Sequence, residues 1–123
     1  MGTRIARITV SVSDLSASLD LYQGVLGLTS GFSDETMVML SDSESVEVLL
    51  HVRKPDASDS GVAASFGVDD VDASTAAAVV AGATVIDPPE DQPWGERQSV
   101  LRDADGHVFC LISPLPEEEP DLL

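Results

Sequence analysis

An internal repeat constrains the fold of this chain more than any other feature. The stretch "VSDLSAS" at residues 12–18 returns 56 residues later as "VDDVDAS" at 68–74, and "LGL" at 26–28 has its counterpart in "AGA" at 81–83. Short repeats of this kind are supersecondary units that pack together to bury one shared core. The chain has 123 residues, which is the size of a single domain. We therefore expect two modules within one domain.

The hydrophobic pattern predicts the same order of elements in both modules: a strand, a helix and three strands. In module one the first strand alternates between an apolar face and a small or polar face, as a half-buried strand requires. The helix that follows has apolar side chains at helical spacing, a cap at Asp14 or Ser16, and a glycine at its end. Its three further strands are predicted at 28–33, 36–41 and 45–52.

Module two is predicted to contain a strand, an Ala-rich helix, a short strand, a proline-rich loop at 88–95, and a hairpin that turns at residues 103–106. The acidic residues Asp69, Asp70 and Asp72 precede or open the Ala-rich helix, where they cap it and complement its dipole. The predicted boundaries are module one at 3–53, a polar linker at 54–61, module two at 62–113, and a flexible acidic tail at 114–123.

Charge narrows the classes of partner. The chain has 22 acidic and 6 basic residues, a net charge of −16, which repels nucleic acid and anionic membranes. The acids are spread along the whole chain, so they are either a general solubility coat or a field that attracts a cationic ligand. No charged leader opens the sequence, and no apolar run approaches about 18 residues. We expect a soluble cytoplasmic protein.

With "VSDLSASLDLYQGVLGL" in module one, and "PWGER" followed by "RDADGH" in module two, residues 4–113 resemble the vicinal oxygen chelate superfamily, also called the glyoxalase / bleomycin resistance / extradiol dioxygenase family. The resemblance implies an α+β fold in which two βαβββ modules form curled mixed sheets around a cup, with the helices outside and the ligand inside. The small or polar strand faces suit a cavity lining. These faces hold Arg7, Thr9 and Ser11 in module one and Ala63, Ser65 and Gly67 in module two.

Metal-dependent members of this family hold a divalent ion with His, Gln or Glu residues from the first and last strands of the modules. The matching positions here are Arg7, Ala63 and Cys110, with Glu47 or Leu49 on the last strand of module one. Arginine has no free lone pair, alanine has no ligand atom and cysteine is a soft ligand. We therefore expect no metal and no cofactor. Instead, Arg7 and Glu47 are predicted to face each other across the cup and form an ion pair.

Three other side chains have two interpretations each. Trp94, the only tryptophan, either plugs the seam between the modules or forms a flat wall for a planar ligand. Arg97 either clamps a ligand carboxylate or pairs with a surface acid. Cys110 is either a nucleophile or a buried structural thiol. The predicted ligand-binding set is Arg7, Thr9, Glu47, Leu49, Ser65, Trp94, Arg97 and Cys110, with no catalytic residue.

The interpretation we favour is a protein that binds a small organic molecule in the cup without a metal, as a homodimer. The resemblance supports it, since non-enzymatic relatives sequester bleomycin-like antibiotics as dimers. The first alternative is a metal-dependent lyase, isomerase or ring-cleaving dioxygenase, but shifting the alignment by one residue offers no better ligands. The second is an interaction module with a filled cup. The sequence leaves open whether modules pair within one chain or between two.

Overall fold

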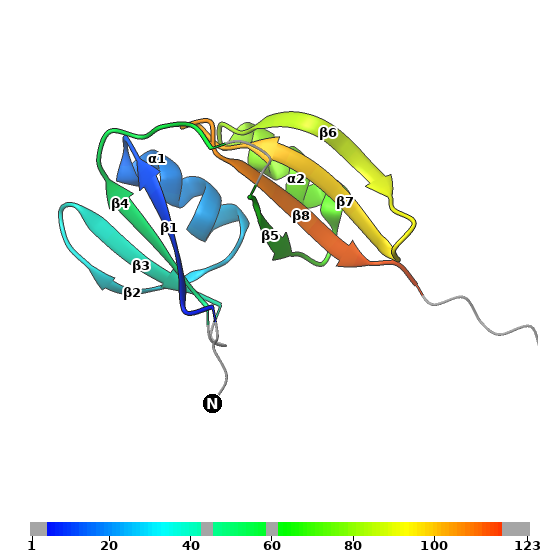
Figure 1. Cartoon of the computed structure of the whole chain (residues 1–123), viewed down its shortest axis with the longest axis horizontal. Helices are drawn as coiled ribbons and strands as arrows, with labels where there is room; N and C mark the ends of the chain where they lie inside the picture. The colour runs from blue at the N-terminus through cyan, green and yellow to red at the C-terminus, as the bar shows by residue number, and fades with distance from the viewer. Residues whose placement is uncertain (1–4, 43–45, 59–61, 117–123) are drawn as a thin grey trace, which may run out of the picture.

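The computed structural model describes residues 5–42, 46–58 and 62–116. It contains two four-stranded mixed sheets that lie next to each other, each with one helical segment against one face (Figure 1). Module one consists of β1 (Arg7–Val12), α1 (Leu15–Leu19), the π-helix η1 (Asp20–Val25), β2 (Thr29–Ser33), β3 (Met37–Ser41) and β4 (Glu47–Val52). Module two consists of β5 (Ala64–Gly67), α2 (Val71–Val80), β6 (Thr84–Asp91), β7 (Glu96–Arg102) and β8 (Val108–Pro114).

The two sheets have the same topology. Their strand orders are β1-β4-β3-β2 and β5-β8-β7-β6. In each sheet the first strand pairs in parallel with the last, and the other neighbours are antiparallel. The predicted fold of two βαβββ modules is confirmed. Most of the predicted tail, residues 117–123, and part of the predicted linker, 59–61, lie outside the described residues.

The helices begin at the predicted aspartates. Asp14 accepts a hydrogen bond from the backbone N–H of Ala17, and Asp70 accepts one from Ala73, so each fills the N-cap of its module. Gly27 and Gly82 follow the helical segments with positive φ angles, as helix-ending residues do. The first helix differs from the regular helix that was predicted, because it widens into the π-helix η1. There the consecutive residues 21 and 22 are both buried.

One predicted loop is wrong. Residues 88–91 belong to β6, which continues through Pro88 and Pro89 to Asp91. β6 is an edge strand, and its pairing with β7 shifts register on both sides of Asp87. Both prolines fall within the second of these register shifts, between Asp87 and Glu90, and proline is tolerated at edge strands and bulges because a ladder hydrogen bond is not required there.

Each sheet has one covered face and one uncovered face. The covered face of module one holds Val12, Leu40 and Leu50, which are fully buried. In module two the buried hydroxyl of Ser99 on β7 bonds to that of Thr75 on α2, at 2.8 Å, which identifies the face that the helix covers. Along β3, β4 and the second half of β7, the residues that alternate with the buried ones point to the opposite face and are half-buried. Within the described residues, no helix is long and apolar enough to cross a membrane.

The modules share one hydrophobic core across the seam where η1 meets α2. Three aromatic rings lie at its centre: the centroid of Tyr22 lies 6.1 Å from that of Phe66 and 6.4 Å from that of Phe109, and the latter two are 6.2 Å apart. The Tyr22 hydroxyl donates a 2.7 Å hydrogen bond to Asp103, which is buried in the turn between β7 and β8. Burial, followed by the nearby Asp103 carboxylate, raises the pKa of Tyr22 well above its ordinary value. The hydroxyl is therefore a permanent donor.

The turn between β7 and β8, residues 103–107, makes most of the other polar contacts across the seam. Asp105 accepts a 2.7 Å hydrogen bond from the Ser13 hydroxyl at the end of β1. Arg102, at the start of the turn, donates to the carbonyls of Ser58 in the linker and Gly106. Gly106 has a positive φ and lies so close to Ala57 that an added Cβ would be 2.9 Å from the alanine Cβ. The turn therefore joins module two to both module one and the linker.

We predict that Tyr22→Phe lowers the free energy of unfolding by about 2 kcal/mol, because a buried hydrogen bond to a carboxylate contributes about 1.5–3 kcal/mol. Urea unfolding followed by circular dichroism measures the change. The ring remains in the core, so a cavity does not contribute. A variant as stable as the wild type would show that the Tyr22–Asp103 bond does not hold the modules together.

Candidate functional site

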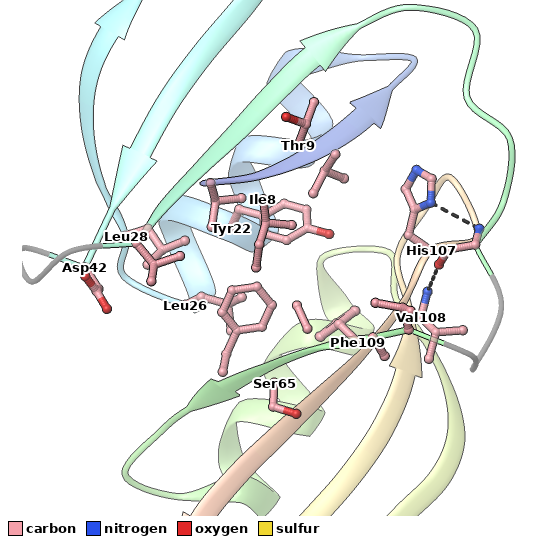
Figure 2. A pocket seen from close by; sticks show the side chains of 18 of the residues that line it. Ile8, Thr9, Tyr22, Leu26, Leu28, Asp42, Ser65, His107, Val108 and Phe109 are labelled. Atoms are coloured by element: carbon pink, nitrogen blue, oxygen red, sulfur yellow. Dashed lines mark hydrogen bonds between the residues drawn. The ribbon is translucent and has the colours of Figure 1, made fainter. Parts of the chain in front are cut away.

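A cleft of about 950 Å³ lies at the seam, between the edge strands β1 and β5. Figure 2 shows Ile8 and Thr9 on the β1 side and Ser65 on the β5 side, with His107 at one end and Asp42 near the other. The lining is mostly aliphatic and aromatic, and its hydroxyl groups come from Thr9, Ser11, Tyr22, Ser58 and Ser65. Its composition resembles that of a site for an apolar molecule or an apolar segment with a few polar anchors.

His107 closes one end of this cleft and links three parts of the chain. Its Nε2 lies 2.8 Å from the Ser11 carbonyl oxygen and 3.2 Å from the Ser11 hydroxyl. Its Nδ1 accepts the backbone N–H of Ser58 at 3.2 Å. A neutral ring with its proton on Nε2 satisfies both contacts. The imidazole therefore has no free acceptor with which to activate the Ser11 hydroxyl, and its role here is to fix β1 and the linker to the turn.

The uncovered faces of the two sheets hold most of the predicted ligand-binding residues. Arg7 lies opposite Glu47 in the register of β1 and β4, and Thr9 lies opposite Leu49. The predicted ion pair between Arg7 and Glu47 is present, with 3.3 Å between Nη2 and Oε1. It joins neighbouring strands of one sheet, so the prediction that the two residues face each other across a cup is wrong.

Ser65 and Cys110 form the corresponding pair in module two, opposite each other on β5 and β8. Burial raises the pKa of the Cys110 thiol; the hydrogen bond with Ser65 lowers it in part, and the Asp87 carboxylate raises it further. A thiol of this kind is a poor nucleophile, because the thiolate is the reactive form. Of the predicted set, Thr9 and Ser65 also line the seam cleft.

Trp94 and Arg97 lie at the other end of module two, near the connection between β6 and β7. Trp94 is 59% exposed and its Nε1 donates to Glu96 at 2.7 Å. Arg97 donates to Asp72 at 2.7 and 3.0 Å and to Asp91 at 2.9 Å. The pKa of Asp72 is lowered, first by the hydrogen bond from Arg97. Within one chain, these two side chains do not join the seam cleft.

The residues at the metal positions of the family do not fit a divalent ion. Arg7 is itself a cation, Ala63 has no ligand atom, and Cys110 is a protonated thiol beside a serine. Glu47 is a single carboxylate, which supplies too few ligand atoms to hold a divalent ion, and it already accepts a hydrogen bond from Arg7. In the part of the chain that the structure describes, no three His, Cys, Asp or Glu side chains come together as a metal site.

Sequence reasoning missed the residues that define the seam. His107 was not predicted to bind anything, and Ser11 was predicted only as part of a strand face. Ser58 lies in the segment predicted to be a linker. The stretch "RDADGH" carried a signal for such contacts, because it is longer than a two-residue hairpin turn and rich in side-chain acceptors. The partners of these acceptors in module one could not be identified from the sequence.

Comparison with known proteins agrees with this architecture. The sequence profile of the Glyoxalase/Bleomycin resistance protein/Dioxygenase superfamily matches residues 4–111. The chain belongs to this superfamily. A crystal structure of a family enzyme from Burkholderia phytofirmans superposes with a TM-score of 0.77 at 22% identity, covering 89% of this chain and 98% of that one.

Two further relatives are informative. TnmS3, an antibiotic binding protein from a Streptomyces species, superposes with a TM-score of 0.69 at 25% identity, covering 91% of this chain and 96% of that one. An uncharacterized protein of Mycobacterium tuberculosis is 46% identical over 54 residues, which are 44% of this chain and 32% of that protein. The matched stretches span from a fifth to about a third of the curated mycobacterial relatives.

We predict that Cys110 in the folded protein reacts with iodoacetamide more slowly than the same residue in urea, at the same mildly alkaline pH. The raised pKa leaves less thiolate in the folded state, and half-burial restricts access. Mass spectrometry follows the reaction, and Cys110 is the only cysteine, so each modified chain reports this site. Equal rates in the two states would contradict the assignment.

Proposed function

We propose that this protein binds a small organic molecule on the uncovered faces of its sheets, without a metal, and that a second copy of the chain completes the binding cup. The observation that carries the proposal is the contrast between the two faces of each sheet. One face is packed under a helix, whereas the other presents half-buried polar and small side chains next to Leu49 and Ile112. Such a mixed surface suits a ligand that is partly apolar and partly polar.

The contact between modules explains why a second copy is required. Within one chain the modules meet through η1, α2 and the turn at 103–107. Arg7, Glu47, Leu49 and Cys110 do not line the seam cleft, so the uncovered faces are not closed against each other there. A partner chain that places its own second module against the first module of this chain would form the cup.

The seam cleft offers the surface on which that partner would dock. Both strands that flank it, β1 and β5, are edge strands, and an open edge is a template for pairing with another chain. Ile5 is 70% exposed and Val62 is 86% exposed at the starts of these strands, and both line the cleft. A two-fold dimer would cover both edges of both copies at once. The relative described as an antibiotic binding protein supports sequestration as the kind of function.

We predict that the purified protein retains no stoichiometric metal after incubation with Zn²⁺, Ni²⁺, Mn²⁺ or Fe²⁺ followed by dialysis, as measured by plasma mass spectrometry. The same metal-free protein is expected to gain thermal stability with at least one member of a panel of planar aromatic compounds that are cationic, neutral or anionic, because a ligand that binds the folded state stabilises it. The charge of the active compounds distinguishes ligand steering by the acidic surface from a solubility coat.

Stoichiometric metal that survives dialysis would contradict the proposal and favour a metal-dependent enzyme. A metal-free protein that no compound stabilises would favour an interaction module.

We predict that Val62→Asp shifts the protein from dimer to monomer in analytical ultracentrifugation, since the charge would be buried in the seam. Val80→Asp is the matched control, because Val80 is 90% exposed on α2, outside the cleft. It should leave the dimer intact. A monomeric wild type, or equal effects of the two substitutions, would count against this interface.

A further inference from the structure

We infer that Arg7 and Glu47 together form a neutral donor–acceptor subsite that selects ligands with a carbonyl oxygen next to an N–H or O–H group, such as lactams. Arg7 would donate to the carbonyl and Glu47 would accept from the neighbouring N–H or O–H. This inference rests on the proposed function, since it names the class of ligand that the uncovered face of module one would take.

The backbone holds the two side chains next to each other. Their Cα atoms are partners in the parallel register of β1 and β4, and the Glu47 N–H donates to the Ala6 carbonyl at 3.0 Å. The side chains are 47% and 40% exposed, so a ligand can reach both. The next row along the same face contains Thr9, Leu49 and Met39, which supplies apolar contact beside the polar pair.

The pair retains hydrogen-bonding capacity for a ligand. The contact between them is a single hydrogen bond from Nη2 to Oε1, whereas a guanidinium has five N–H donors and a carboxylate has two acceptor oxygens. A fully engaged pair would share two parallel hydrogen bonds. A planar group that carries an acceptor and a donor side by side, as a lactam does, can form hydrogen bonds with both residues at the same time.

Arg97 and Arg102 make more side-chain hydrogen bonds than Arg7 does. Arg97 is held by two carboxylates, and Arg102 donates to backbone carbonyls. Arg7 is paired with one carboxylate through one contact. Because the charges of Arg7 and Glu47 cancel, the subsite favours a dipolar group over an ion, even on a chain whose net charge is −16.

The two modules differ at this subsite, which gives a bound ligand one orientation. The repeat places Ala63 and Val108 at the positions that correspond to Arg7 and Glu47. The uncovered face of module two instead offers the pair formed by Ser65 and Cys110. The end of the ligand that carries the carbonyl and the N–H or O–H therefore belongs on module one, and its other end belongs against module two.

The test uses isocarbostyril, a planar fused lactam, and its N-methyl derivative, which keeps the ring and the carbonyl but lacks the N–H. Isothermal titration calorimetry on the intact wild-type protein should show the lactam binding about tenfold more tightly than the N-methyl compound, because a hydrogen bond to a charged group is lost. Arg7→Met should weaken lactam binding by about tenfold.

Two variants serve as controls. The exchange R7E/E47R keeps one donor and one acceptor in swapped positions and should restore most of the preference for the lactam. Lys54→Met removes one positive charge from the exposed linker and should bind like the wild type. Circular dichroism confirms that each variant is folded.

Equal affinity for the two compounds, or an unchanged affinity in the Arg7→Met protein, would overturn the inference while the proposed function stands. Failure of the wild type to bind isocarbostyril, when other compounds of the aromatic panel do bind, would also overturn the inference alone. If no compound of the panel binds, the proposed function fails with it.

Discussion

The buried hydrogen bond between Tyr22 and Asp103 is the contact on which the arrangement of the two modules depends. It joins a hydroxyl of one module to a buried carboxylate of the other, and without it one carboxylate oxygen would lack this partner inside the core, which is costly. The aromatic rings at the seam pack around this contact, and the turn lies close to the linker at Gly106. Because the modules meet through their helices and this turn, the opposite faces of both sheets are left free for other contacts.

A repeated fold with unlike faces would suit the asymmetric ligand that we propose. The strands, caps and helix ends of the two modules follow the same pattern, since these positions are fixed by backbone geometry. The uncovered faces are not subject to that constraint. Module one has a charged pair where module two has an alanine and a valine. Similar backbones therefore present different side-chain chemistry on the uncovered faces of the two modules.

Much of the fold could be predicted because its signals are local. The repeat, the alternation of Ile8, Val10 and Val12, and the capping aspartates each depend on neighbours a few residues away. The seam could not be predicted in the same way. His107 binds Ser11 and Ser58, which are 96 and 49 residues distant, and no periodicity encodes such a pair. The ion pair of Arg7 with Glu47 was predicted, but its geometry required the strand register.

Pro88 and Pro89 in β6 have a consequence for how chains assemble. β6 is the outer edge of its sheet, and there the prolines, two register shifts and neighbouring acids oppose the addition of another strand. The outer edge of the other sheet, β2, is interrupted between Ser30 and Ser33. Within the described residues, the inner edge strands, β1 and β5, pair with their neighbours without a register shift. Growth from the outer edges would give an open fibre, whereas in the two-fold dimer that we propose the inner edges of both chains are covered. The irregular outer strands therefore disfavour open-ended growth of the sheets.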